Sequence, residues 1–341
     1  GNGNGSGSGL TDAETAGWVQ IPSSEFKIYS SSCFQVYRSN TQSNSSKISK
    51  PIVVFLPGLD NKMMPYHQRD RLHAHGFDVV CMLQTNGMRP SWNDINYQGT
   101  AILKALSTSG VILIGESFGG AVALQLALHL VERKRYKHLL HRLVLINSAS
   151  ALNEQSLLSS AAKILPFVER TGSLATSIYP YAAFVLWRII TERDRLHTSQ
   201  QVNNKVDILS APLDVSFHRI SLIRQADASS ERLKALEDIP VLAIASKRDK
   251  LLKSKDEAMR LKTFIGNNCS VMLLPDSGHA CLLEDDVNLG DRIADWISTK
   301  SRTLRAGDGV DPSFRHDPNV LKLWDRYLAP WNFITSPQFL G

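Results

Sequence analysis

Ser117 lies between two glycines in the segment LIGESFGG, residues 113–120. The pattern G-x-S-x-G is typical of a serine nucleophile at a sharp strand-to-helix turn, where the glycines keep the strand and the helix from colliding. A small residue at an ordinary strand–helix junction is the alternative interpretation. Because an apolar run (111–115) precedes the motif and an amphipathic segment (119–134) follows it, we predict that Ser117 is a nucleophile.

A serine hydroxyl attacks a substrate only when a base removes its proton, and an acid must orient that base. In this kind of site the expected chain order is serine, acid, histidine. Asp249 follows the apolar run VLAIAS (241–246), and His279 follows the next run, SVMLL (270–274). We therefore predict that Ser117, Asp249 and His279 act together.

Asp276 is a second candidate for the acid, since it lies three residues before His279 in the same loop. So short a separation favours local hydrogen bonds to the loop backbone instead. We expect Asp249 to orient His279 and Asp276 to brace the loop.

The oxyanion of an acyl transfer needs two backbone N–H donors. One is expected from the residue after the nucleophile, Phe118, and the other from the loop after the first strong strand. That loop is LPGLD (56–60), in which Gly58 permits a tight turn. We predict the amides of Leu59 and Phe118 as the donors, with an ordinary Pro-Gly turn as the alternative for Leu59.

Two other patterns are interpreted as chance or as packing. His73 and Asp78 have the H-x4-D spacing of glycerolipid acyltransferases, but they run from the end of a helical segment into a strand. Cys281 comes two residues after His279 without a turn motif of its own, so we expect it to pack beneath the loop. The cysteines show no metal-type pairing, and we predict neither a metal nor a cofactor.

Apolar runs of strand length recur along the chain with little polar alternation, which is typical of strands buried on both faces. They lie at 52–56, 77–83, 111–115, 143–147, 241–246 and 270–274, with a short edge element at 33–38. Helices are expected at 64–76, 119–134, 254–266 (with Ser254 as N-cap) and 285–298. This alternation predicts an α/β fold with a mostly parallel, doubly wound sheet covered by helices.

The alternation breaks between residues 151 and 237, where helical patterns rich in large apolar side chains occur without a clear strand. We predict an inserted helical cap (151–237) over the carboxyl ends of the strands, where open sheets bind ligands. The glycine-rich start predicts a flexible segment (1–22) before the main domain (23–300). Residues 301–341 are expected to form a C-terminal extension or linker.

Composition and charge limit the binding partners and the cellular location that we expect. The net charge is +6, and the basic segment 132–138 is predicted to be a solvated helix end, with contact to an anionic membrane or lipid-droplet surface as the alternative. Nucleic acid is not expected, because no basic and aromatic residues interleave. Four scattered cysteines, the lack of a signal-peptide pattern and an uncharged stretch (171–187) interrupted by Pro180 predict a soluble intracellular protein.

With these motifs in place, the sequence resembles the α/β-hydrolases. Within them it is similar to the plant and algal plastid family of esterase/lipase/thioesterase-like proteins that includes the phytyl ester synthases. The similarity covers roughly residues 50–300 and rests on FLPGLD, GESFGGAVAL, LVLINSAS, IPVLAIASKRDKLL and LLPDSGHACLLEDDVNL. It implies an α/β-hydrolase fold and the same five site residues.

The resemblance also implies a serine-dependent acyl-ester hydrolase or acyltransferase. Its substrates would be lipid-like esters or thioesters, with water or a long-chain alcohol such as phytol releasing the acyl group, and its location the plastid. Family members typically continue into an acyltransferase-like domain, so a piece of a longer protein and a hydrolase-only relative are both open. A small-ester or peptide hydrolase and a non-catalytic ligand-binding module are the alternative functions.

Overall fold

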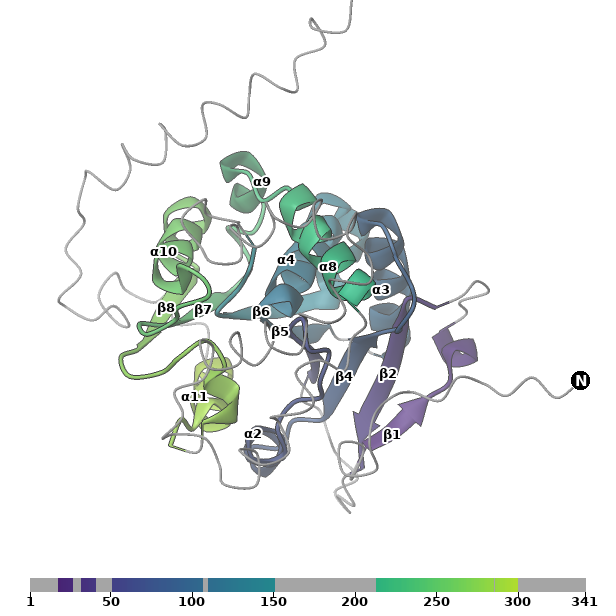
Figure 1. The fold of residues 1–341 in the computed structure, drawn as a ribbon, viewed down its shortest axis with the longest axis horizontal. Helices are drawn as coiled ribbons and strands as arrows, with labels where there is room; N and C mark the ends of the chain where they lie inside the picture. Colours follow the sequence, from purple (N-terminus) through teal and green to yellow (C-terminus); the bar gives the residue numbers. More distant parts are fainter. Residues whose placement is uncertain are drawn as a thin grey trace, which may run out of the picture. The chain divides into compact units, whose positions relative to one another are not determined.

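The computed structural model describes residues 18–26, 32–40, 51–106, 110–150, 213–284 and 286–299. They belong to the first of two compact units, Gly1–Asp308. Within this unit the described residues form one eight-stranded sheet in the order β1-β2-β4-β3-β5-β6-β7-β8. Helices pack against both faces of the sheet (Figure 1).

The central part of the sheet is parallel, as the apolar runs predicted. β3, β4, β5, β6, β7 and β8 pair in parallel, whereas β2 pairs antiparallel with β4, and β1 with β2. The strand bounds are β1 Trp18–Ile21, β2 Phe34–Ser39, β3 Ile52–Leu56, β4 Val79–Gln84, β5 Val111–Glu116, β6 Leu140–Ile146, β7 Val241–Ser246 and β8 Cys269–Leu274.

The prediction of a flexible segment up to residue 22 is wrong for its last residues. β1 pairs with β2 from Trp18 opposite Ser39 to Ile21 opposite Val36. The guanidinium of Arg69 lies 5.4 Å from the centroid of the Trp18 ring. Four residues give too short a pattern to be recognised, because only pairing with a distant segment makes them a strand.

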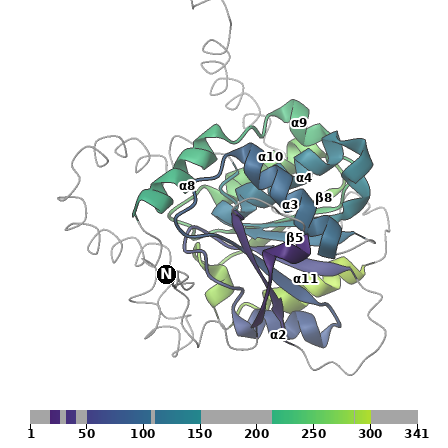
Figure 2. The same cartoon turned by 90° about the vertical axis from the view of Figure 1, so that its right-hand side faces the viewer.

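Helices divide between the two faces of the sheet (Figure 2). One face carries α3 (Trp92–Leu106), α4 (Phe118–Glu132), α8 (Leu213–Gln225), α9 (Ser230–Lys234) and α10 (Ser254–Ile265). The other carries α2 (Tyr66–Ala74) and α11 (Leu289–Ser298). Short 3-10 helices are η1 (Ser23–Phe26), η2 (Lys134–Leu139) and η4 (Cys281–Leu283).

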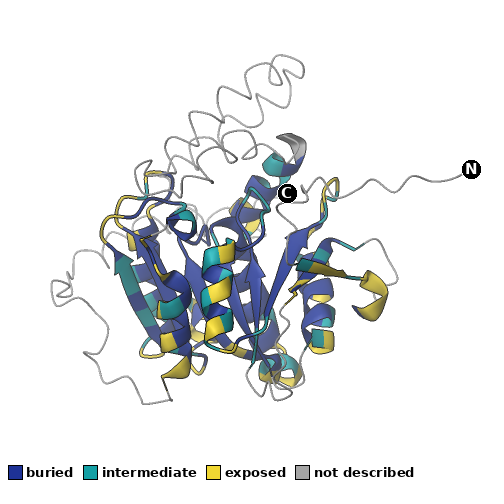
Figure 3. Cartoon of the chain, turned by 90° about the horizontal axis from the view of Figure 1, so that it is seen from below, coloured by how far each residue is buried: buried dark blue, intermediate teal, exposed yellow. Residues whose placement is uncertain are grey.

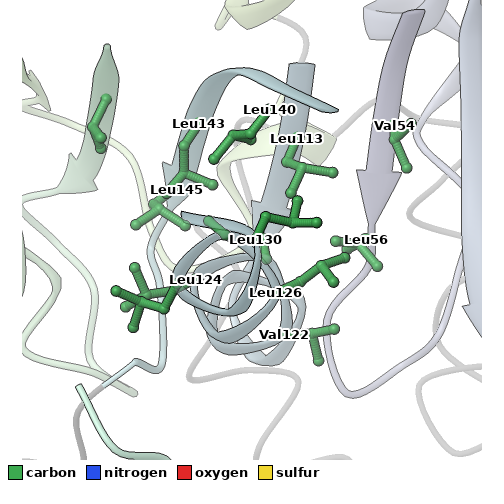
Figure 4. Packing of buried hydrophobic residues seen from close by; sticks show 14 of the residues in the cluster. Val54, Leu56, Leu113, Val122, Leu124, Leu126, Leu130, Leu140, Leu143 and Leu145 are labelled. Carbon is green, nitrogen blue, oxygen red and sulfur yellow. The ribbon is translucent and has the colours of Figure 1, made fainter. Parts of the chain in front are cut away.

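Successive side chains of each central strand lie on opposite faces of the sheet and pack in two separate hydrophobic clusters. In β5, Leu113 packs on the α4 side, whereas Ile112 and Ile114 pack on the α2 and α11 side. The central strands β3, β4, β5 and β7 are almost entirely buried (Figure 3). Leu126 and Leu130 of α4 are fully buried in the same cluster as Leu113 (Figure 4). Burial of one such side chain contributes about 1.5–3 kcal/mol, so α4 is fixed firmly against the strand that precedes it.

Helices α2, α4, α10 and α11 lie where they were expected, but two details differ. Ser254 is the first residue of α10 and not its N-cap, which is Lys253. The Ser254 hydroxyl donates instead to Asp249. The helix α3 was not predicted from the sequence; its indole at Trp92 donates to the carbonyl of Leu222 in α8 at 3.0 Å.

The predicted cap is only partly described, because residues 151–212 lie outside the described ranges. The remaining part contains α8 and α9 and packs on the main body. The side-chain amide of Gln125 in α4 donates to the Asp227 carbonyl at 2.7 Å. None of the described helices is long and apolar enough to cross a membrane.

Candidate active site

Ser117 alone forms the turn between β5 and α4. β5 ends at Glu116 and α4 begins at Phe118, and Ser117 between them has φ 52° and ψ −117°. A non-glycine residue with positive φ is strained and persists only when its surroundings hold it. Here its N–H donates to the Ile146 carbonyl at 2.9 Å, and its carbonyl accepts from Ala149 at 2.9 Å.

The two glycines of the motif allow the helix to approach the strand. A Cβ atom on Gly115 would lie 2.3 Å from the carbonyl oxygen of Gly119. A Cβ atom on Gly119 would lie 2.0 Å from the carbonyl oxygen of Leu56 at the end of β3. Real Cβ atoms do not come this close to backbone, so both positions require glycine if the turn is to form.

The structure brings Ser117, His279 and Asp249 together from three different strand ends. His279 Nε2 lies 2.9 Å from Ser117 Oγ, and His279 Nδ1 lies 2.8 Å from Asp249 Oδ2. The His279 and Asp249 side chains are 7% and 1% exposed. With its Nδ1 proton directed at Asp249, the imidazole presents Nε2 to accept the Ser117 hydroxyl proton.

Ser117, His279 and Asp249 form a hydrogen-bonded relay. Its electrostatics favour a protonated His279 beside an ionised Asp249. Burial lowers the pKa of His279, but the charge and the hydrogen bond of Asp249 outweigh it, so the pKa lies above its usual value. Burial raises the pKa of Asp249, but His279 and the donors Leu252 N–H and Ser254 hydroxyl lower it overall. The site can therefore stabilise an imidazolium, which forms when the serine proton moves to the histidine.

The two predicted oxyanion donors lie beside Ser117. Phe118 opens α4, and the N–H groups of a first helical turn have no acceptor within the helix. The loop of Leu59 passes the nucleophile closely, since a Cβ atom on Gly58 would lie 3.5 Å from Ser117 Cβ. Within the described part of the chain, the Leu59 amide donates no hydrogen bond to another backbone group.

A model described as the alpha/beta hydrolase family matches residues 53–295. The chain belongs to this family. The α/β-hydrolase is 27% identical over 266 residues to phytyl ester synthase 1, chloroplastic, of Arabidopsis thaliana. The match covers 70% of this chain but 36% of the relative, so the chain spans little more than a third of that relative's length.

Solved α/β-hydrolase structures share the fold at low sequence identity. An esterase of Exiguobacterium antarcticum superposes with a TM-score of 0.59 at 16% identity, covering 77% of this chain and 96% of its own. Carboxylesterase CesB of Bacillus subtilis gives a TM-score of 0.58 at 16% identity, covering 84% and 95%. These similarities establish the fold of this α/β-hydrolase.

Asn147 is a residue of this α/β-hydrolase that sequence reasoning missed. It is fully buried after β6 with φ 43°. Its Nδ2 donates to the His279 carbonyl at 2.7 Å and to Ser246 Oγ at 2.9 Å, while its Oδ1 accepts from Ser246 N–H at 2.8 Å. One side chain thus ties the histidine loop to the ends of β6 and β7. The asparagine that ends the run LVLIN (143–147) was the only signal in the sequence.

The remaining candidates take other places. Asp276 is exposed and pairs with Arg248 at 2.9 Å, so it lies away from the imidazole. Cys281 is buried, accepts a hydrogen bond from Asn147, and has a pKa raised well above its usual value by burial, which keeps it a thiol. All four cysteines are free and buried.

The two residues of the H-x4-D pair make separate contacts. His73 Nδ1 lies 2.8 Å from the Phe77 carbonyl, and Asp78 pairs with Arg38 at 3.1 Å. Among the described residues, no group of three or more histidine, cysteine, aspartate or glutamate side chains could hold a metal ion.

Two further carboxyl groups influence the site of this α/β-hydrolase. Glu116 directly precedes Ser117, and burial together with the charge of Asp60 raises its pKa to about 8, although His279 acts in the opposite direction. Burial also raises the pKa of Asp60, against the charges of Lys62 and Arg219. Neither carboxyl was recognised from the sequence as part of the site, because its effect depends on burial.

Proposed function

We propose that the protein is a serine-dependent acyl-ester hydrolase or acyltransferase that works through an acyl-enzyme at Ser117. The observation that carries this proposal is the continuous relay from Ser117 Oγ through His279 to Asp249, with contacts of 2.9 Å and 2.8 Å. The relay is buried, and a low dielectric strengthens each of its interactions.

In the first half-reaction Ser117 Oγ attacks the acyl carbonyl while its proton moves to His279 Nε2. The carbonyl oxygen becomes an oxyanion and accepts hydrogen bonds from the Leu59 and Phe118 amides. The tetrahedral intermediate then collapses as His279 gives the proton to the leaving alcohol or thiol. Asp249 stays ionised and stabilises the imidazolium throughout, in keeping with its lowered pKa.

In the second half-reaction an acceptor hydroxyl attacks the acyl-enzyme. His279 removes the acceptor's proton, the same amides hold the oxyanion, and Ser117 regains a proton as it leaves. Water gives a free acid, whereas an alcohol gives a new ester. The relay is the same for both, so the acceptor bound beside Ser117 decides between hydrolysis and transfer.

For the substrate we propose lipid-like esters or thioesters, with a phytol-like alcohol as acceptor and the plastid as location. This rests on the similarity to the chloroplastic phytyl ester synthase. Peripheral contact with a membrane or lipid droplet would be compatible with such substrates.

The test compares purified wild type with Ser117→Ala on acyl esters of increasing chain length, with and without phytol. The expected result is turnover that rises with chain length, phytyl ester formed when phytol is present, and neither product from Ser117→Ala. Turnover confined to the shortest esters would instead indicate a small-ester hydrolase. Ligand binding without turnover would indicate a binding module and refute the proposal.

A further inference from the structure

A buried arginine lies at the junction of α8 and the loop that carries Leu59. Arg219, in the middle of α8, is 1% exposed. Removing a guanidinium from water is unfavourable unless charges or hydrogen bonds compensate for it. Moreover, its Nη2 atom is buried without a hydrogen-bond partner among the described residues. A side chain that served only to hold α8 in place would be better apolar, so the partners of Arg219 indicate its role.

The partners of Arg219 lie in the loop after β3 and at the last residue of β4. Nη1 donates to the Leu59 carbonyl at 2.8 Å, and Nε donates to Gln84 Oε1 at 2.8 Å. Gln84 is itself tied to the loop after β3. Its N–H donates to Asn61 Oδ1 at 2.8 Å, and its carbonyl accepts from Asn61 Nδ2 at 2.8 Å. Arg219 thus completes a network that encloses the loop.

This network fixes both peptide groups that flank Leu59. The Gly58 carbonyl accepts from the Asn61 N–H at 3.1 Å. In a trans peptide the carbonyl and the N–H point in opposite directions, so this bond directs the Leu59 N–H away from Asn61. The next peptide is held by Arg219 through the Leu59 carbonyl. Arg219 therefore fixes the peptide after Leu59, whereas the Leu59 N–H belongs to the peptide before it. If the Arg219 bond is lost, the following peptide is free to rotate, and this acts on the Leu59 N–H through the Leu59 backbone that the two peptides share.

The charge of Arg219 acts on the same loop. Burial lowers its pKa to about 10, with the charge of Asp60 acting in the opposite direction, so the guanidinium stays charged at neutral pH. Burial raises the pKa of the Asp60 carboxyl beside Gly58, and the charge of Arg219, together with that of Lys62, offsets part of this rise. An uncompensated carboxylate there would oppose a developing oxyanion.

We propose that Arg219 is a positioning residue, which fixes the peptide after Leu59, steadies the loop that presents the Leu59 amide to the oxyanion, and so couples α8 to the reaction centre. This inference rests on the proposed function. It assigns a task to a residue that does not touch the substrate. It also links α8, a helix of the predicted cap, to the chemistry at Ser117, so that a shift of α8 would change the rate of the acyl step.

The test is steady-state kinetics of Arg219→Met and Arg219→Lys on a soluble short-chain ester. Loss of one oxyanion donor lowers kcat about 10²–10³-fold, so a misoriented donor should lower it by about 10–100-fold. We expect this loss in Arg219→Met with KM within about twofold of wild type. Arg219→Lys should recover part of the rate, because it keeps the charge but cannot donate to both acceptors at once.

Arg260→Met is the matched control. Arg260 is also buried, binds Glu257 with Nε at 2.7 Å and donates to the Ala228 carbonyl at 2.8 Å. Arg260→Met should lower the unfolding midpoint, as we also expect of Arg219→Met, while kcat stays at the wild-type value.

Three outcomes would count against the inference. Wild-type kcat in Arg219→Met, with the wild type active, would overturn it and leave the proposed function standing. If Arg219→Met does not fold, wild-type kcat in folded Arg219→Lys overturns it in the same way. A wild type without turnover would overturn the proposed function, and this inference with it.

Discussion

Replacing Asp249 with asparagine should lower the activity and also shift the pH at which activity appears. In the wild type the Asp249 carboxylate lies 2.8 Å from His279 Nδ1, with 1% of the Asp249 side chain exposed. Burial alone lowers the pKa of the imidazole, but this carboxylate raises it above 6.5. The neutral imidazole is the active form, so wild-type activity should rise with pH through a pKa above 6.5.

The direction of the shift follows from the lost charge. The Asp249 carboxylate outweighs the effect of burial on His279, so without it burial lowers the pKa of the imidazole. The acidic limb of the profile should therefore move to lower pH in Asp249→Asn. The plateau of kcat/KM should fall about 10⁴-fold, because an asparagine side chain favours the wrong histidine tautomer.

The assay is kcat/KM for hydrolysis of a soluble short-chain ester, measured from acidic to neutral pH. Asp276→Asn is the matched control, since Asp276 lies in the loop that carries His279 but is exposed and paired with Arg248. Thermal unfolding shows that each variant is folded. A profile that moves in Asp276→Asn and stays in place in Asp249→Asn would refute the assignment of the acid.

Three further substitutions test other parts of the site. Asn147→Ala should destabilise the protein by about 1–3 kcal/mol for each buried partner left unsatisfied, and it should lower kcat/KM by loosening the His279 loop; denaturant unfolding and kinetics measure both. Gly119→Ala places a Cβ 2.0 Å from the Leu56 carbonyl oxygen. The free energy of unfolding, measured by thermal unfolding, should therefore fall by about 3 kcal/mol or more. Glu116 ionises near pH 8, and its negative charge then opposes the oxyanion. Activity should fall above that pH in the wild type but not in Glu116→Gln, as an alkaline pH profile will show.

The parallel sheet was predictable because each of its strands contains an apolar run. A strand buried on both faces needs no partner to be recognised, and β3, β5 and β7 lie within one residue of their predicted bounds. β1 was missed because its four residues become a strand only by pairing with β2. The helix α3 was missed because its buried face mixes apolar residues with Asn96, Gln98 and Thr100.

The reacting groups of the site were predictable for a related reason. Ser117, Asp249 and His279 each lie in the turn or loop that follows a strand, and parallel strands bring their carboxyl ends to one edge. The supporting groups were not predictable. Asn147 reaches a carbonyl 132 residues away, and Arg219 one 160 residues away. Such contacts depend on how helices and loops pack, and no local pattern in the sequence encodes them.

The most direct test of the central claim is to identify the side chain that becomes covalently modified. A fluorophosphonate probe reacts with an activated serine, and mass spectrometry of the digested protein locates the adduct. We expect one adduct, on Ser117, which is absent from Ser117→Ala and forms more slowly at acidic pH, where His279 is protonated. A folded wild type that gives no adduct, or one that is modified elsewhere and spared at Ser117, would contradict the assignment of Ser117 as the nucleophile.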